Sequence, residues 1–423
     1  MRHNKEGECT FWKTRFFKNT KIARTLQSTM KNNLKLLALL IATAACTTVW
    51  GQRGSSEIGQ TSKNYISTGM PILLTAPDAV SGAMGDAGVA SRPDAYSAHW
   101  NCAKFAFIEN EMGFSTTYTP WLRNLGVGDM NLLYLSGYWH FNERSTAAVS
   151  LTYFSLGDIQ STDEFGTERG NMHPNEFAVD ASYAMKISDN LSLGASGRLN
   201  HSDLTNGQDV GNQTTKAANS LAADVGLYYQ SEKTKGQQFA LGCFISNLGA
   251  KLSYSDDDTE KEFLPANLRL GGRYSNEIDN YNKINLLLDI NKLLVPTPPV
   301  QKNGESDVEF SKRYNNYTNM GVVEGAINAL YDAPGGMTEK FQELQFSAGA
   351  EYWYNDMVAA RAGYFYEHAN KGGRQYATVG FGIRYNLFAF DFAYLIPTTK
   401  LSNNPLTNTV RITLTVDFAQ NKK

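Results

Sequence analysis

A serine and a histidine on one face of a predicted strand come closest to a catalytic arrangement in this sequence. Ser136 and His140 are four residues apart, which in an extended strand separates them by about 13 Å. Ser150, on the next predicted strand, could lie closer to His140. Serines and histidines also occur as ordinary polar residues on strands, and only a direct nucleophile–base contact would establish a lipid-ester hydrolase. We therefore expect no catalytic residue and no enzymatic activity.

No other motif predicts catalysis or a bound cofactor. The sequence contains no HExxH, CxxC or GxSxG motif and no Walker A lysine. An acidic run at 256–258 lies in a predicted outer loop, but it lacks the regular ligand spacing of a calcium site. We expect neither a metal nor a cofactor. Cys102 and Cys243 could form one disulfide, although two small apolar core residues are favoured.

The charge balance excludes nucleic acid as a partner. The chain has 423 residues, with 39 Lys+Arg, 41 Asp+Glu and a net charge of −2, whereas nucleic-acid-binding domains are usually strongly basic. The basic residues concentrate in residues 1–51, which carry nine of them. A soluble protein of this length would contain two or three domains, but a large β-barrel is an exception to that expectation.

Residues 1–51 have the features of a secretory signal peptide. A short basic stretch at 31–35 precedes a mostly apolar stretch at 36–45, and a cut before Gln52 would follow small or modest residues. The apolar stretch is about half the length that a membrane-spanning helix requires, which disfavours a membrane anchor. The signal itself begins at Met30, so residues 1–29 are either a misassigned upstream start or a long basic extension.

From residue 112 onward, apolar and polar residues alternate with a period of two, which is typical of strands with two different faces. Near the end of the chain, Val410, Ile412 and Leu414 alternate with Arg411 and Thr413. The segments are about ten residues long, the length of a tilted strand that crosses a bilayer. Fourteen such segments occur, at 112–119, 130–141, 146–156, 175–187, 190–201, 219–230, 238–248, 266–275, 282–292, 343–354, 357–367, 375–386, 388–397 and 408–418.

The connections between these segments alternate long and short, as the outer loops and periplasmic turns of outer-membrane barrels do. Charged strand residues such as Asp180, Arg198 and Arg361 share the more polar face, and the opposite face carries leucines and aromatics. We predict an all-β fold, a 14-stranded antiparallel transmembrane β-barrel in contact with outer-membrane lipid. A large secreted β-sandwich is the alternative, but it does not explain the alternation. The predicted parts are a signal peptide at 1–51, an N-terminal plug or hatch at 52–111, the barrel at 112–418 and a periplasmic tail at 419–423.

One outer connection, residues 293–342, is long enough to fold on its own. Residues 321–332 have apolar residues at helical spacing, and the Ala-Pro-Gly-Gly sequence at 333–336 would end that helix. A second helical turn could begin at 337–344. The loop is either a lid packed on the rim or a docking surface for a partner outside the cell, and both can hold. The candidate contact residues are Val322, Ile327, Leu330, Tyr331, Asp332, Pro334 and Gly335.

Residues 75–104 resemble the N-terminal signature of the PorV family, outer-membrane proteins of the type IX secretion system. Three stretches carry the resemblance: 76–78, 84–90 and 100–101; residues 331–336 also resemble part of the family's long loop. Cys102 replaces the proline of the usual Asn-Pro-Ala turn, and Val80 stands where arginine is common. The resemblance implies a FadL-like barrel from a Gram-negative bacterium of the Bacteroidetes. The plug residues, which we expect to be structural, are Pro77, Asp78, Gly82, Met84, Gly85, Asp86, Gly88, Asp94, Trp100 and Asn101.

The small and acidic residues of this signature suit a plug inside a barrel. Glycines at 82, 85 and 88 permit tight turns and a close approach of backbones. Asp78, Asp86 and Asp94 can accept backbone N–H bonds in turns, or they can pair with lumen arginines such as Arg269, Arg273 or Arg384.

The resemblance also implies a function in protein secretion. Members of the family associate with the large translocon barrel Sov and receive cargo proteins that carry a C-terminal β-sandwich signal domain. They pass this cargo to the cell-surface attachment complex that contains the sortase PorU. The alternative function is a FadL-like transporter of hydrophobic small molecules, which would need an apolar pocket beneath the outer loops. The plug and the strand count suit both functions.

Overall fold

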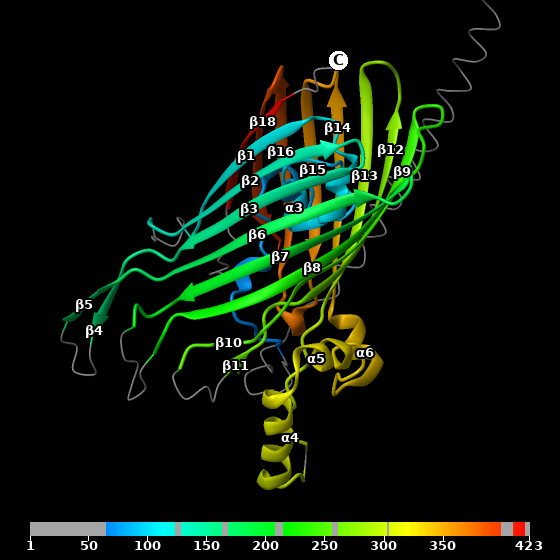
Figure 1. Ribbon diagram of the computed structural model, residues 1–423. Helices are drawn as coiled ribbons and strands as arrows, with labels where there is room; N and C mark the ends of the chain where they lie inside the picture. Colours follow the sequence, from blue (N-terminus) through cyan, green and yellow to red (C-terminus); the bar gives the residue numbers. More distant parts are fainter. Residues whose placement is uncertain are drawn as a thin grey trace, which may run out of the picture. The chain divides into compact units, whose positions relative to one another are not determined.

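The computed structural model describes residues 65–122, 128–162, 168–207, 215–255, 261–302, 304–398 and 409–418. The predicted signal peptide, the acidic run at 256–258 and the predicted tail lie outside the described residues. Fourteen of the strands close into one antiparallel barrel, in which neighbours along the chain pair and β1 meets β18 at the seam (Figure 1). The predicted fold is confirmed.

The barrel strands lie within a few residues of the predicted segments, because the period-two pattern persists through each of them. Small register shifts interrupt the β2–β3 pair at His140 and the β8–β9 pair at Ala223. The strands are β1 Met112–Pro120, β2 Asn131–Asn142, β3 Ser145–Ser155, β6 Asn175–Lys186, β7 Leu191–Asp203, β8 Ala218–Gln230, β9 Gln237–Gly249, β12 Asn267–Glu277, β13 Asn282–Leu293, β14 Leu344–Tyr354, β15 Val358–Tyr366, β16 Gln375–Tyr385, β17 Phe388–Pro397 and β18 Val410–Phe418.

Side chains alternate between the lumen and the outer surface of the barrel. In β8, Asp224 is buried inside, whereas the side chain of Leu221 is 70% exposed on the outside. Several of the charged residues form pairs in the lumen: Arg361 donates to Glu351 at 2.7 Å and to Asp391 at 2.6 Å. A charge that faced lipid at mid-bilayer would cost about 2–4 kcal/mol, so the sequence places its strand charges inside.

The long connections gather at one end of the barrel and the short turns at the other (Figure 1). Because outer loops are the longer ones in such barrels, we assign the long-loop end to the cell exterior. Two hairpins extend from these connections and were not predicted from the sequence. They pair β4 Ile159–Thr162 with β5 Glu168–Met172, and β10 Leu252–Ser253 with β11 Lys261–Glu262.

The long outer loop is helical in three places. The helix predicted over 321–332 is shorter, α5 Val322–Asn328, and the predicted second turn is α6 Gly336–Gln342. The first helix, α4 Asp307–Asn319, was missed; it begins at a Ser306–Glu309 capping box and buries no residue. A short 3₁₀ helix, η5 Ala369–Lys371, lies between β15 and β16. None of the helices in the described ranges is both long and apolar enough to cross a membrane.

The segment before the barrel runs through the lumen from the outer end to the periplasmic end. Near its start, the Gly69 N–H bonds the carbonyl of Phe263 in an outer connection at 3.0 Å. At its end, the Glu111 N–H bonds the Phe418 carbonyl at 3.2 Å, beside the start of β1. Between these points lie four short helices: η2 Pro71–Leu74, α2 Ala79–Gly82, α3 Ser97–Trp100 and η3 Cys102–Phe107.

Candidate functional site

The predicted plug motif braces its own short helices against one another. Asp78 is the N-cap of α2, and its carboxylate accepts the backbone N–H of Ser81 at 2.7 Å and the indole N–H of Trp100 at 2.6 Å. Because Trp100 lies in α3, this one carboxylate joins two helices of the plug. Asn101 caps η3 and donates to the Leu227 carbonyl of β8 at 2.9 Å, which joins the plug to the wall.

Strand side chains of the barrel wall satisfy the irregular backbone of the plug. The carboxylate of Asp289 in β13 accepts the N–H groups of Gly88 at 2.7 Å and Val89 at 2.9 Å. The hydroxyl of Thr378 in β16 accepts the Gly85 N–H at 2.8 Å. Unpaired backbone groups are costly at membrane depth, so these contacts indicate a plug that is held rather than loosely inserted.

Glycines let the plug approach the wall at backbone distance. Gly85 has a φ of +68°, and a Cβ there would lie 2.5 Å from the backbone nitrogen of Tyr364. A Cβ on Gly88 would overlap the ring of Trp100. The plug glycines were recognisable in the sequence, but their partners in the wall were not, because nothing near a strand glycine in the sequence indicates which residue it faces. The wall glycines that make room for the plug are Gly194, Gly226, Gly242, Gly271, Gly349, Gly363 and Gly380.

The plug acids do not pair with the arginines that were named as candidates. Asp94 accepts the Tyr96 N–H at 3.1 Å within its own turn, and Asp78 binds as described above. Asp86 accepts the Tyr376 hydroxyl at 2.5 Å and lies 3.9 Å from Arg411. Arg269 instead reaches the plug through the carbonyl of His99 at 3.0 Å. Turn formation, the other predicted role, accounts for Asp78 and Asp94.

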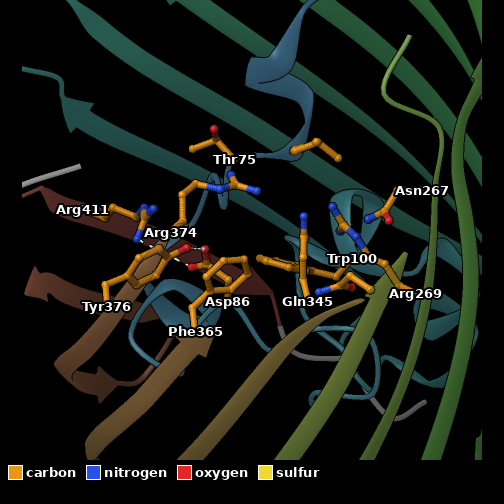
Figure 2. A pocket seen from close by; sticks show the side chains of 12 residues that line it. Thr75, Asp86, Trp100, Asn267, Arg269, Gln345, Phe365, Arg374, Tyr376 and Arg411 are labelled. Carbon is orange, nitrogen blue, oxygen red and sulfur yellow. Dashed lines mark hydrogen bonds and ion pairs between the residues drawn. The ribbon is translucent and has the colours of Figure 1, made fainter. Parts of the chain in front are cut away.

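A small polar pocket lies between the outer side of the plug and the wall, and Figure 2 shows its charged lining. Its volume is about 30 Å³, which is room for very few water molecules. Arg374 enters it while paired with Glu367 at 2.8 Å, and Arg411 points toward Asp86 (Figure 2). An apolar molecule would have to displace or bury these charges, at high cost.

An ion-pair network fixes the helical loop to the barrel rim. The carboxylate of Glu343 contacts the ammonium groups of Lys292 at 2.5 Å, Lys340 at 3.1 Å and Lys371 at 3.1 Å. Burial raises the pKa of Glu343, but Lys292 and Lys371 lower it more, to about 2. Lys340 also pairs with Asp332 at 2.6 Å. Asp332, predicted as a partner contact, is therefore an anchor within the loop.

The same loop exposes a set of large apolar side chains, which we call the outer platform. Exposed fractions reach 68% at Tyr331, 71% at Met337 and 66% at Phe341. Exposed apolar residues grouped on a fixed scaffold are typical of protein-binding surfaces. Of the predicted contact residues, Ile327, Leu330 and Tyr331 belong to the outer platform. Val322 is half-buried, and Pro334 and Gly335 lie exposed at the turn before α6. The platform comprises Val323, Ile327, Leu330, Tyr331, Met337 and Phe341.

A comparison with protein-family models now identifies the family. The model described as Type IX secretion system protein PorV matches residues 58–300, which is more than half of the 423 residues. The chain belongs to the PorV family. It is therefore an outer-membrane component of the type IX secretion system, and its closed 14-stranded barrel agrees with that location.

Several solved barrels resemble this PorV-family chain at low identity. The toluene transporter TbuX of Ralstonia pickettii is 14% identical, with a TM-score of 0.47 over 81% of this chain and 98% of that one. The monoaromatic hydrocarbon channel CymD is 16% identical, with a TM-score of 0.45 over 82% and 98%. A FadL homologue of Pseudomonas aeruginosa is 12% identical, with a TM-score of 0.42 over 81% and 99%. A search of curated protein sequences finds no match.

The departure from the PorV signature at Cys102 leaves its turn intact. Asn101 keeps an extended backbone, and its side chain accepts the Ala103 N–H at 3.1 Å. The Cys102 side chain is fully buried against the plug core, and both Cys102 and Cys243 are free thiols. Cys102 therefore acts as a small apolar core residue at a position where the family usually has proline.

The serines and the histidine considered for ester hydrolysis form no catalytic pair. The hydroxyl of Ser136 donates to the carbonyl of Ala95 in the plug. The hydroxyl of Ser150 donates to Asp180 at 3.1 Å, and His140 contacts the hydroxyl of Thr146. Within the residues that the structure describes, no three His, Cys, Asp or Glu side chains are grouped so that they could hold a metal ion.

Proposed function

We propose that this chain is the cargo-handling barrel of the type IX secretion system and is not an enzyme. It would bind secreted proteins through their C-terminal β-sandwich signal domain beside the translocon barrel Sov. It would then deliver them to the attachment complex that contains the sortase PorU. Membership of the PorV family supports a role in the type IX secretion system, and the exposed apolar residues of the outer platform support binding of cargo there.

The outer platform is the observation that carries this proposal. Its six apolar side chains lie on α5, on α6 and on the turn between them, outside the membrane. The network around Glu343 holds the scaffold in place, so little ordering of the loop would be needed on binding. The lumen is occupied by the held plug, which favours binding on the outer surface over passage of cargo through this barrel.

The rival function, transport of hydrophobic small molecules, requires an apolar pocket beneath the outer loops. The pocket at that position is small, and arginines and Asp86 line it (Figure 2). Apolar ligands favour larger pockets with mainly apolar walls. A transporter of this kind should bind a fatty acid such as palmitate saturably. We expect the opposite: calorimetric titration of the purified barrel with palmitate should show no saturable binding. Saturable binding would favour the transporter function.

The cargo proposal predicts that charge on the outer platform disrupts binding. Ile327→Asp together with Tyr331→Asp should weaken retention of a purified C-terminal signal domain at least about tenfold, because central interface residues contribute about 2 kcal/mol or more. Deletion of residues 305–340 should abolish retention while the barrel still inserts. Surface plasmon resonance on the full chain in detergent would measure the affinity.

Val308→Asp provides the matched control for these substitutions. Val308 is 79% exposed on α4 in the same loop but lies outside the outer platform. Its substitution should leave the affinity unchanged. Retained binding by the double variant or the deletion variant would show that cargo docks elsewhere, and an equal loss from Val308→Asp would show that the effect is general to the loop.

A further inference from the structure

A second cavity, of about 600 Å³, lies beneath the plug at the periplasmic end of the barrel. Its lining includes Lys233, Asp356 and Asn386, which belong to the short turns, so the cavity faces the periplasm. Its other walls come from the plug around Arg92 and from the inward faces of the strands. The volume lies in the range of about 300–1,000 Å³ that is usual for small-molecule sites.

Most charges in this cavity form pairs. The lining carries six basic and seven acidic side chains, so the total charge does not decide whether the cavity binds a cation or an anion. That choice depends on which of these side chains already have an ion-pair or hydrogen-bond partner. Deep in the cavity, Arg361 contacts both Glu351 and Asp391. At the rim, Lys283 lies 2.7 Å from Asp356 and 3.3 Å from Glu277, and Lys233 also pairs with Glu277.

Three arginines of the lining have no carboxylate within ion-pair distance among the described residues: Arg92, Arg273 and Arg384. The guanidinium carbons of Arg92 and Arg384 lie 5.8 Å and 4.9 Å from the ring centre of Trp353. The Nε atoms of Arg273 and Arg384 are buried and have no hydrogen-bond partner. Arg273 already donates through Nη2 to the Tyr228 hydroxyl at 3.4 Å and to Gln230 and Gln238 at 3.3 Å. The side chains of Arg92 and Arg384 make no hydrogen bond to another described residue, so their guanidinium groups keep donors for a ligand that accepts hydrogen bonds.

The remaining acids of the cavity offer less to a cation. Asp94 accepts the Tyr96 N–H and the Ser97 hydroxyl, and Asp417 accepts the Tyr138 hydroxyl at 2.9 Å. Glu109 is exposed at the periplasmic side of the plug. Two of these three acids are therefore already engaged by neighbouring donors, whereas the guanidinium groups of Arg92 and Arg384 lie together over Trp353 without an acidic partner among the described residues.

We propose that this cavity binds a small organic anion from the periplasm that carries two or more oxyanion groups, carboxylate or phosphate. Arg92 and Arg384 supply the charged donors, Arg273 adds positive charge to the wall, and the guanidinium fork matches either oxyanion geometry. Trp353 forms the floor between Arg92 and Arg384. The site lies at the opposite end of the barrel from the outer platform, and the proposal does not depend on the secretion function.

The test titrates citrate and inorganic phosphate into the full chain in detergent, followed by calorimetry and tryptophan fluorescence. Citrate should bind saturably, and Arg92→Ala and Arg384→Gln should each weaken it about tenfold, the usual loss for one charged hydrogen bond. Trp353→Phe should remove the fluorescence change. The control is Lys233→Ala, at the rim and paired with Glu277, which should leave the affinity unchanged. Saturable phosphate binding with the same arginine dependence would support the site and indicate phosphate ligands.

Several outcomes would overturn the proposal. These are absence of saturable binding by either anion, binding that Arg92→Ala and Arg384→Gln leave unchanged, or binding of a hexaglutamate peptide alone. Each variant is first checked for the heat-dependent gel mobility of a folded barrel. Arg92 is exposed to the cavity, so Arg92→Ala should fold even if a strand variant does not.

Discussion

At the scale of residues, a few hydrogen bonds and close backbone contacts fix the position of the plug in the barrel. Asp289 binds two consecutive plug N–H groups, and Gly85 meets the backbone of Tyr364 without a side chain between them. The plug motif was recognisable in the sequence because its glycines and acids are closely spaced along the chain. Its partners were not, since Asp86 and Tyr376 are separated by 290 positions and no local pattern links them. Of the two predicted roles, turn formation applies to Asp78 and Asp94, and Asp86 lies 3.9 Å from a lumen arginine, Arg411, that was not among the arginines named.

Gly85→Ala should destabilise the barrel by about 1–3 kcal/mol, because the new methyl group would clash with the wall and sit in a left-handed conformation. Gly207→Ala is the matched control: Gly207 has the same φ of +68°, but nothing lies within 4 Å of a Cβ there. Urea unfolding in detergent would measure both variants. Equal losses in the two variants would mean that backbone strain alone, not contact with the wall, accounts for the effect.

At the scale of elements, the barrel strands were predicted well because their alternation of polar and apolar residues repeats. One helix and two hairpins in the outer connections were missed. The fourteen strands follow the period-two alternation, which one buried and one lipid-facing side impose. Helix α4 was missed because it buries no residue and is mostly polar apart from one aromatic stripe of Phe310, Tyr314 and Tyr317. The β4–β5 and β10–β11 hairpins have strands of only two to five residues, too short to show a clear period of two. The helices α5 and α6 were found because Gly and Pro residues mark their ends.

The network at the loop base predicts a dependence of α6 on pH. The pKa of Glu343 is about 2 in the folded chain and ordinarily 4.5. Its stabilisation is therefore complete above pH 4.5 and is lost as the pH falls toward 2. Hydrogen-exchange protection of residues 336–342, corrected for intrinsic rates, should decrease between pH 6 and pH 3.

Glu343→Gln should remove most of that pH dependence and cost about 3 kcal/mol of local protection at pH 6, since it leaves the buried Lys292 without its ion-pair partner and removes one of two acidic partners from Lys340 and Lys371. Glu324→Gln, an exposed acid on α5 of the same loop, is the control and should behave like the unmodified chain. Full protection of α6 in Glu343→Gln at pH 6 would show that apolar packing, not the ion pairs, holds the loop.

At the scale of the molecule, we expect the plug to block free passage of ions through the barrel. The unmodified chain should show little steady conductance in planar bilayers. A variant without residues 70–108 should conduct clearly more, because the plug is hydrogen-bonded across the lumen. Equal conductance from both chains would show that the plug does not seal the barrel; the deletion variant must first pass the gel-mobility check.

The path of the plug also constrains how this protein is assembled. The segment enters near Gly69 at the outer mouth, leaves at Glu111 beside β1, and is bonded to β8, β13 and β16 on the way. The close contacts between wall glycines and plug backbone leave little room for threading this segment through a closed barrel. We therefore expect β1 and β18 to pair last, around a plug that is already in place and that acts as a template for closure of the barrel.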